Sequence, residues 1–445
     1  MLKKLRRKKH LHLPKPPEPG IYHFARQWGD YERSRIHLRI DRGGTGILIV
    51  NASRFVHLNP TAAFMADMVL NEVPASQALE AIHQYYRVPR TQAKIDYTDC
   101  AQQVEALIQP DGACPIHDLN LEVSAPFSVK PDAPYRMDLA ITYRCNNDCA
   151  HCYNARPRNY PELPTDKWKQ IIDHLWDIGI PHIVFTGGEP TLREDLPELI
   201  AYAEQNGQIT GLNTNGRKLS DQAYLEKLIG AGLDHIQITL ESHDENIHDG
   251  MVGYRGAWRQ TVAGIQNALT SRLFVMTNTT MLLSNSRVMA DTLDFLALLG
   301  VPTIGLNALI YAGKGLNVGN GLPESELAPL LVLAREKTSK NGQKLIWYTP
   351  TQYCNLDPVL LELGVKGCTA ALYNMCVEPN GDVIPCQSYY SSLGNLLTQD
   401  WKDIWNHELA DQLRKHNFAP EKCQNCTLFT ECGGGCPLRL RADLT

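Results

Sequence analysis

The sequence predicts an α/β protein whose central part is a partial (β/α)6, TIM-like barrel, with a small α+β domain before it and a small cysteine-rich domain after it. Three observations support this fold class. Strand and helix patterns alternate regularly through the middle of the chain, three β-rich runs and three helical stripes precede them, and most of the thirteen cysteines lie at the two ends of that region. A composition of 43% hydrophobic and 20% charged residues over 445 residues excludes disordered and fibrous classes.

Residues 1–20 are basic and rich in proline, and we expect them to form a solvated, disordered tail. Contact of this tail with a membrane surface or nucleic acid is the alternative. No apolar signal-peptide region follows the basic run, and no apolar segment is long enough to span a membrane. A net charge of −5 gives no bias toward nucleic acid. We therefore expect a cytoplasmic protein without a membrane span or a nucleic-acid partner.

Residues 21–108 are expected to form a compact, winged-helix-like domain. The runs IHLRI, GILIV and FVHL predict an antiparallel meander of three strands, because turn-forming segments separate them. Three amphipathic helices should follow, and Asn59 can cap the first of them with Pro60 in its first turn. Residues 109–135 are rich in proline, asparagine and aspartate, which predicts a linker.

Residues 136–340 should form the barrel. The strands are expected at 137–142, 182–186, 209–213, 235–240, 273–281 and 303–309. The amphipathic helices are expected at about 165–178, 194–206, 220–232, 258–271, 286–299 and 324–339. In a parallel barrel the reactive groups lie at the C-terminal ends of the strands, because the loops converge there.

Three cysteines, Cys145, Cys149 and Cys152, follow the first barrel strand with the spacing C-x3-C-x2-C. Three thiolates on one loop can hold three corners of a [4Fe–4S] cluster and leave one iron open. A zinc site completed by His151 is the alternative, although the chain would have to fold back on itself. Two further cysteines, Cys100 and Cys114, stand apart and are expected to be unreactive.

The three cysteines are followed by other motifs in a definite order. Thr186 to Pro190 reads TGGEP at the end of the second strand, Asn213 to Gly216 ends the third, and Gln237 to Ser242 ends the fourth. Together with the cysteine loop, these motifs resemble the radical S-adenosylmethionine (SAM) superfamily. The resemblance implies that SAM binds the open iron and is cleaved reductively, and that the resulting 5′-deoxyadenosyl radical abstracts a hydrogen atom from the substrate. An electron donor such as flavodoxin or ferredoxin would supply the electron.

The resemblance also implies which residues contact SAM. Glu189 would accept hydrogen bonds from its ammonium group, and the two glycines before it would allow close approach of the backbone. The alternative is that these polar residues only cap helices or satisfy loops. The expected cofactor-binding residues are Gly187, Gly188, Glu189, Pro190, Asn213, Thr239, Glu241, Asn278 and Leu309.

Residues 341–445 carry eight cysteines and resemble the SPASM extension, which holds auxiliary iron–sulfur clusters in peptide-modifying radical SAM enzymes. The resemblance implies one group of Cys368, Cys386 and Cys436 and a second group of Cys423, Cys426 and Cys432. Each group is one ligand short. Cys354 and Cys376 are available to complete the first, whereas Asp443, a spare cysteine or no residue at all would complete the second. A structural zinc site at Cys423–Cys436 is the alternative.

The N-terminal domain resembles the PqqD-like element that binds the leader of a precursor peptide as an added strand. The alternative is a winged-helix-like domain that packs on the barrel or binds nucleic acid. The sequence departs from the family pattern at Gln387. Sulfatase maturases of this family have an aspartate base at this place, whereas glutamine cannot usefully accept a proton. Oxidation to formylglycine is therefore less expected.

The sequence thus predicts a radical SAM peptide maturase, an oxidoreductase-type enzyme that modifies a ribosomally synthesised precursor peptide. It would contain a [4Fe–4S] cluster that binds SAM and one or two auxiliary iron–sulfur clusters. Two alternatives remain open: a radical SAM enzyme acting on a small molecule or cofactor precursor, and a zinc-stabilised scaffold that binds nucleic acid. No catalytic acid or base is predicted.

Overall fold

The computed structural model describes residues 13–28, 32–51, 54–109 and 131–442. Its chain divides into two compact units, Met1–Ser124 and Ala125–Thr445, which are described separately. The basic run of the tail, most of the expected linker, Cys114 and Asp443 lie outside the described residues. The domain boundaries drawn from the sequence therefore stay predictions.

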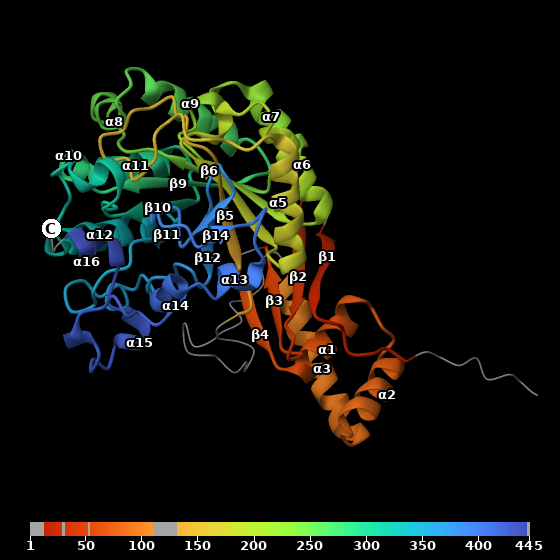
Figure 1. The fold of residues 1–445 in the computed structure, drawn as a ribbon. Coiled ribbons are helices and arrows are strands. Elements are labelled where there is room, and N and C mark those ends of the chain that lie inside the picture. The colour runs from red at the N-terminus through yellow and green to blue at the C-terminus, as the bar shows by residue number, and fades with distance from the viewer. Residues whose placement is uncertain (1–12, 29–31, 52–53, 110–130, 443–445) are drawn as a thin grey trace, which may run out of the picture. The chain divides into compact units, whose positions relative to one another are not determined.

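The first unit is an antiparallel sheet followed by three helices (Figure 1). Its strands are β1 (Gly20–Trp28), β2 (Glu32–Ile40), β3 (Gly46–Val50) and β4 (Arg54–Leu58), paired in that order. Its helices are α1 (Pro60–Leu70), α2 (Ala75–Tyr86) and α3 (Arg90–Ile108). The prediction of three strands was wrong, because β1 pairs with β2 along its whole length. As an edge strand β1 is only partly buried, so it has no strongly apolar run.

The predicted start of α1 is confirmed. The Asn59 side chain accepts a hydrogen bond from the backbone N–H of Ala62 at 2.9 Å, and Pro60 occupies the first turn. The core of this unit joins the sheet to the helices through side chains such as Ile36, Leu38 and Phe64, all without exposed surface. This unit therefore has a hydrophobic core of its own.

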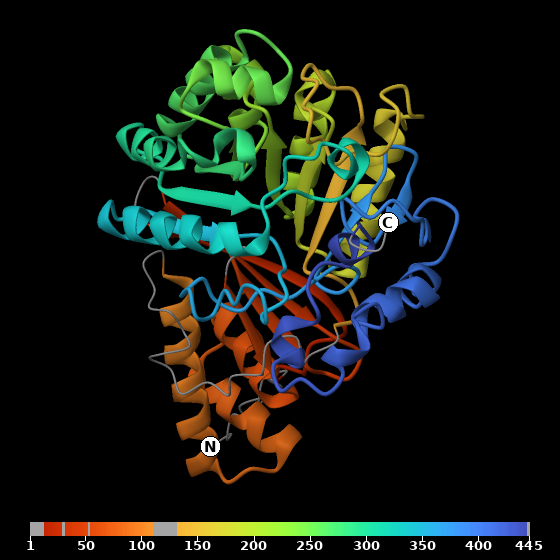
Figure 2. The same ribbon diagram turned by 90° about the vertical axis from the view of Figure 1, so that its left-hand side faces the viewer.

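The second unit contains one sheet of ten strands in the order β11-β10-β9-β8-β7-β6-β5-β12-β13-β14. The strands are β5 (Arg136–Thr142), β6 (His182–Gly187), β7 (Ile209–Thr214), β8 (His235–Thr239), β9 (Phe274–Thr280), β10 (Thr303–Asn307), β11 (Lys344–Trp347), β12 (Asn374–Val377), β13 (Asp382–Ile384) and β14 (Gly394–Asn395). Strands β5 to β11 run parallel to one another, and β12 runs parallel to β5 but antiparallel to β13. From β5 to β11 the strands follow one another in chain order, whereas β12 to β14 lie on the other side of β5 (Figure 2).

Helices cover the outer face of this sheet (Figure 1). They are α5 (Thr165–Ile178), α6 (Leu196–Asn206), α7 (Gln222–Gly230), α8 (Glu245–Val252), α9 (Ala257–Leu269), α10 (Leu283–Ser286), α11 (Met289–Leu298) and α12 (Glu324–Lys340). Trp168 of α5 and Leu199 of α6 pack in one core with Leu139 and Phe185 of the strands. The six predicted strands and six predicted helices are all present, which confirms the α/β fold class with a partial barrel.

The last part of the chain extends the sheet on both sides. Strand β11 lies beyond residue 340 and pairs with β10, while β12 pairs with β5. Strands β13 and β14 complete that edge as an antiparallel pair. Short helices follow, namely α13 (Trp401–Trp405), α14 (Glu408–Arg414), α15 (Phe429–Cys432) and α16 (Pro437–Ala442). Among the described helices, none is both long and apolar enough to cross a membrane.

Candidate functional site

The three predicted cluster cysteines lie on the loop that leaves the C-terminal end of β5, where a parallel barrel places its chemistry. Their thiols are close enough to influence one another. Burial and, to a smaller extent, the Cys152 and Cys145 thiols raise the pKa of Cys149. Burial also raises the pKa of Cys145 to about 11. Ligation requires thiolates, so binding of a cluster here releases protons.

The glycines of the TGGEP segment hold this cysteine loop in place. The Gly188 N–H donates to Thr142 O and the Glu189 N–H donates to Arg144 O, each at 2.8 Å. A Cβ added at Gly187 would lie 2.0 Å from Thr142 O, and one added at Gly188 would lie 2.3 Å from Arg144 O. Only glycine fits at either position, because the backbone just before Cys145 occupies the space of a side chain.

Glu189 joins the ends of two strands. Its side chain is fully buried, and Oε1 accepts hydrogen bonds from the Thr191 hydroxyl at 2.6 Å and the Thr214 hydroxyl at 2.7 Å. Oε2 accepts from the Asn215 N–H at 2.8 Å. Protein donors therefore already engage both carboxylate oxygens. The expected contact of Glu189 with the SAM ammonium group stays a prediction.

Two residues after β7 fasten the cysteine loop from the same side. The Arg217 guanidinium, only 7% exposed, donates to Asn146 O at 2.5 Å and to Asn147 Oδ1 at 2.8 Å. The Asn215 amide donates to Asn146 Oδ1 at 2.7 Å. The Asn147 N–H in turn points to Cys145 Sγ at 3.4 Å. These hydrogen bonds hold the loop through its backbone and its asparagine side chains. The cysteine thiols therefore remain available to bind a cluster.

The far side of the loop is held by α8 and by a glycine-rich segment. The Asp148 N–H donates to Val252 O at 2.9 Å, at the end of α8. The Lys314 ammonium pairs with Asp148 Oδ1 at 2.6 Å, and the Gly315 N–H donates to Cys152 O at 3.3 Å. The segment around residues 313–315, which the sequence shows only as a glycine-rich loop, therefore closes over the third cysteine.

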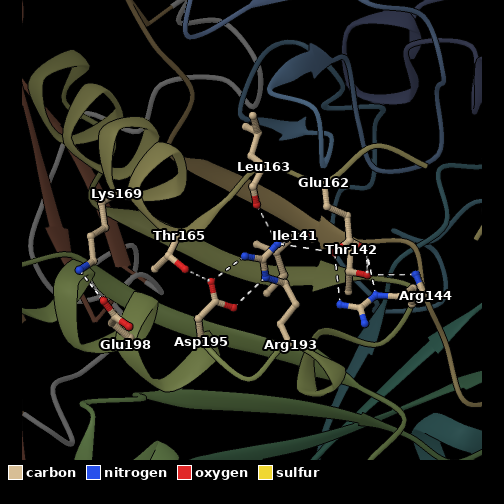
Figure 3. A network of polar contacts seen from close by, with 10 residues as sticks. All are labelled: Ile141, Thr142, Arg144, Glu162, Leu163, Thr165, Lys169, Arg193, Asp195 and Glu198. Atoms are coloured by element: carbon tan, nitrogen blue, oxygen red, sulfur yellow. Dashed lines mark hydrogen bonds and ion pairs between the residues drawn. The ribbon is translucent and has the colours of Figure 1, made fainter. Parts of the chain in front are cut away.

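An ion pair between buried Arg193 and partly buried Asp195 supports the strand end from which the loop departs (Figure 3). The Arg193 guanidinium binds both oxygens of Asp195 at 2.8 and 2.6 Å and also donates to Ile141 O and Leu163 O. Glu162 accepts from the Thr142 hydroxyl at 2.5 Å and from Arg144. The network borders a surface cleft of about 490 Å³. Through Arg193, the network links the segment after β6 to the end of β5 and to the segment before α5.

Replacing Arg193 with alanine is expected to lower the free energy of unfolding by about 2–4 kcal/mol, because one buried carbonyl, one partly buried carbonyl and one carboxylate lose their donor. Lys169→Ala is the matched control, since Lys169 and Glu198 form an exposed pair in the same region, and it should cost less than about 1 kcal/mol. Equal losses in urea unfolding of the two variants would contradict this account of the network.

The contribution of Asp195 should depend on pH. Burial alone would raise the pKa of Asp195, but hydrogen bonds from Arg193 and Thr165 hold it below its ordinary value. A carboxyl pKa lowered by folding stabilises the protein above the unfolded value of about 3.9, and this contribution is lost as pH falls further. The difference in stability between Arg193→Ala and the unmodified chain should therefore shrink at acidic pH.

The polar residues predicted to contact SAM line neighbouring strand ends. Asn213 pairs in register with Gln237, and Thr239 pairs with Asn278. Asn213, Thr239 and Asn278 are all partly exposed. The Asn278 Oδ1 atom is buried and has no hydrogen-bond partner within the described part of the chain. A polar ligand at this edge would donate a hydrogen bond to the Asn278 oxygen. SAM carries such donors, so these residues fit SAM.

Two other predicted contacts have different surroundings. Leu309 is 5% exposed and packs with Met251 and Leu282 in a small apolar cluster. Glu241 is 1% exposed, and its Oε1 lies 3.0 Å from His151 Nε2, while Oε2 accepts from the Thr280 N–H at 2.8 Å. Burial alone would lower the pKa of His151, but the Glu241 carboxylate raises it. His151 is therefore engaged by Glu241 rather than turned toward the cysteines as a zinc ligand.

Three of the C-terminal cysteines, Cys368, Cys386 and Cys436, influence one another electrostatically. The pKa of Cys368 is raised by burial and then by the Cys436 and Cys386 thiols, which places these three together. Cys376 lies on β12, fully buried in a small cluster with Ala140, Tyr143 and Ile384. Burial raises its pKa first, and the nearby Cys386 thiol contributes. Cys376 is therefore positioned near the first group.

Contacts from the segment that follows Cys152 reach the C-terminal part of the chain. The Arg156 guanidinium binds both oxygens of buried Glu378, just after β12, at 2.7 Å each. The Tyr153 hydroxyl, directly after Cys152, donates to Gln387 Oε1 at 3.0 Å. Gln387 therefore makes a structural contact at the place where sulfatase maturases have a base.

Within the described residues, no group of three or more His, Cys, Asp and Glu side chains is arranged so that it could hold a metal ion. Ligation by the predicted cysteines, Cys145, Cys149, Cys152, Cys354, Cys368, Cys376, Cys386, Cys423, Cys426, Cys432 and Cys436, therefore stays a prediction. Arg193, Arg217 and Lys314 could not be predicted as supports of the site, since a single basic residue carries no periodic pattern. Only the position of Arg217 directly after the predicted third-strand motif could have indicated it.

Comparisons with known proteins agree with this geometry. Residues 139–296 match the model of the radical SAM superfamily, and residues 368–427 match that of the SPASM iron–sulfur cluster-binding domain. Fe-coproporphyrin III synthase of Methanosarcina barkeri is 30% identical over 334 residues, which cover 68% of this chain and 82% of that protein. PqqA peptide cyclase of Bradyrhizobium diazoefficiens is 29% identical over 316 residues, covering 68% and 81%.

Among solved structures, SuiB of Streptococcus suis bound to the precursor peptide SuiA superposes with a TM-score of 0.68 at 16% identity. The match covers 91% of this chain and 94% of SuiB, and at this identity it shows a shared fold. The chain belongs to the radical SAM superfamily. It is therefore an enzyme with SAM, a [4Fe–4S] cluster and auxiliary iron–sulfur clusters as cofactors, and not a zinc-stabilised scaffold. The bound cluster supplies the electron for reductive cleavage of SAM.

Proposed function

We propose that this enzyme modifies a ribosomally synthesised precursor peptide whose leader binds to the N-terminal unit. The observation that carries the proposal is the separate four-stranded sheet with three helices and its own core. A strand at the edge of a sheet can pair with an extended peptide as an added strand, and main-chain hydrogen bonds then provide affinity for many sequences. An electron donor such as flavodoxin or ferredoxin completes the proposed reaction.

The edge formed by β4 suits this role best. The Arg54 side chain of β4 donates to Leu107 O at 2.5 Å and Gln109 O at 2.7 Å, at the C-terminal end of α3. Strand β4 is therefore fastened beside the third helix, which is where a PqqD-like element would receive its leader. The other edge, β1, is instead linked to the end of α1 by a bond from Arg26 to Leu70 O.

Two of the similar proteins support a peptide substrate. PqqA peptide cyclase acts on a peptide by its name, and SuiB has been solved with its precursor peptide. The SuiB match extends over most of this chain, whereas the sequence match to the cyclase covers about two thirds of it.

A truncated chain that begins at Ala125 tests the proposal, because the second unit has its own core. Its affinity for a candidate precursor peptide, taken from the neighbouring reading frames, should fall at least about tenfold in fluorescence anisotropy, a loss of about 1.4 kcal/mol. Formation of 5′-deoxyadenosine without peptide should persist and serves as the control. Unchanged peptide affinity with intact SAM cleavage would contradict leader binding by the N-terminal unit.

The second candidate function is modification of a tetrapyrrole or another small cofactor precursor. The 30% identity with Fe-coproporphyrin III synthase favours it, and an AdoMet-dependent heme synthase of the same organism is 27% identical over 320 residues. In this case the N-terminal unit would be structural. A single reaction that contains both the precursor peptide and a porphyrin precursor separates the two candidate functions.

A further inference from the structure

The outer side of the cysteine loop is bordered by exposed basic side chains. The Arg158 guanidinium donates to Cys145 O at 2.8 Å and also binds Asn147 O and the Asp148 carboxylate. The Lys314 ammonium binds the same Asp148 oxygen at 2.6 Å. About half of each basic side chain is exposed, 50% for Arg158 and 51% for Lys314. Both residues therefore present positive charge to solvent directly beside the loop.

The segment after α8 continues this border. A Cβ added at Gly253 would lie 2.5 Å from Asp148 O, so this segment touches the loop. The next residue, Tyr254, is 45% exposed, and the Arg217 guanidinium that holds the loop lies 3.6 Å from the centre of its ring. Arg255 follows and is exposed as well. An exposed aromatic ring and a further cation thus lie beside the cysteine loop.

These groups form one surface, which we call the loop rim and define as Arg144, Arg158, Tyr254, Arg255 and Lys314. Arg144, directly before the first cysteine, is 52% exposed although it pairs with Glu162. In the described contacts, the four basic residues of the rim pair with two carboxylates, Asp148 and Glu162, so the rim keeps a positive charge on a chain whose net charge is −5. The three cysteine side chains are only partly buried. A protein bound to the loop rim would therefore lie close to their thiols.

We propose that the loop rim is the docking surface for the protein that delivers the electron, an acidic carrier such as flavodoxin. This assignment rests on the electron donor of the proposed function but does not depend on the substrate. The positive rim attracts acidic side chains of the carrier. Exposed Tyr254 offers an aromatic contact of the kind that is enriched at protein interfaces. The docked carrier is oxidised by one electron, which passes to the cluster of the cysteine loop.

Charge reversal at Arg255 tests the docking surface, because within the described residues no hydrogen bond or ion pair of its side chain holds the loop. Arg255→Glu should weaken binding of oxidised flavodoxin to the full chain about tenfold at low salt in biolayer interferometry. Arg255→Lys keeps the charge and should bind like the original chain. The effect of Arg255→Glu should shrink at high salt, because salt screens exposed charges.

Lys340→Glu is the matched control, since it changes the net charge by the same amount. Lys340 is exposed at the end of α12, just before β11 begins. It therefore lies toward the N-terminal ends of the parallel strands, whereas the cysteine loop leaves the C-terminal end of β5. This variant should bind flavodoxin like the original chain.

A second measurement follows formation of 5′-deoxyadenosine without any substrate, driven either by reduced flavodoxin or by dithionite. In Arg255→Glu the KM for flavodoxin should rise about tenfold, while cleavage driven by dithionite, a small reductant, should stay unchanged. The proposal is overturned if Arg255→Glu matches Lys340→Glu with flavodoxin, or if it loses cleavage equally with dithionite.

The same assay separates this proposal from the choice of substrate. An original chain that cleaves SAM with dithionite but not with flavodoxin would overturn the donor and the docking surface together. A wrong assignment of the peptide substrate would leave every one of these results unchanged, because no substrate is present.

Discussion

Simultaneous replacement of Cys145, Cys149 and Cys152 with alanine is expected to abolish formation of 5′-deoxyadenosine from SAM under reducing conditions. The three thiols share one loop at the C-terminal end of β5 and influence one another's pKa. Without them no protein ligand on this loop remains for the cluster that delivers the electron to SAM. The measurement is chromatographic detection of 5′-deoxyadenosine with anaerobically purified protein.

Cys100→Ala is the matched control for this triple variant. Cys100 belongs to the first unit, which carries none of the predicted cluster cysteines, and its removal should leave SAM cleavage unchanged. Unchanged cleavage in the triple variant would defeat the assignment of the loop as the site of the radical-generating cluster. Zinc without iron in the purified protein would defeat it as well.

Alanine at Gly187 or Gly188 should displace the cysteine loop. The added methyl group would lie 2.0 or 2.3 Å from a backbone oxygen of Thr142 or Arg144, and Gly187 has a φ of 138°, which other residues rarely adopt. Overpacking and backbone strain together should lower stability by about 2–5 kcal/mol. A displaced loop should also reduce SAM cleavage by about 100-fold, because small errors in position are costly.

Gly250→Ala controls for the substitution itself. Gly250 lies in α8, and an added Cβ there would have no heavy atom within 4 Å. This variant should be as stable as the original or more so by up to about 1 kcal/mol, since alanine favours a helix. Thermal unfolding, iron content and 5′-deoxyadenosine formation are compared in the three variants. Normal iron content and activity in Gly188→Ala would show that the loop does not depend on this close contact.

The regular parts of the fold could be predicted because their patterns are long and strong. Helices such as α5 (Thr165–Ile178) and α9 (Ala257–Leu269) place an apolar stripe against the sheet, so their limits follow from the sequence within a few residues. Strands β11 to β14 are two to four residues long, too short to show any period. Edge strand β1 escaped prediction for a related reason, since only part of its surface is buried.

The candidate site was predicted in its motifs but not in its supports. The cysteine spacing and the TGGEP segment are local, and the structure brings them together through bonds from Gly188 and Glu189 to the loop. The contacts of Arg193 and Arg217 depend on the folded chain, because their partners lie far away in the sequence.

One reaction tests most directly whether the radical chemistry of this enzyme acts on a peptide. The full chain is incubated anaerobically with SAM, a reductant, the candidate precursor peptide and a porphyrin precursor, and both possible substrates are analysed by mass spectrometry. We predict a changed peptide mass, 5′-deoxyadenosine formed in proportion to the modified peptide, and an unchanged porphyrin. An unchanged peptide together with a consumed porphyrin would contradict the peptide assignment and establish the tetrapyrrole alternative.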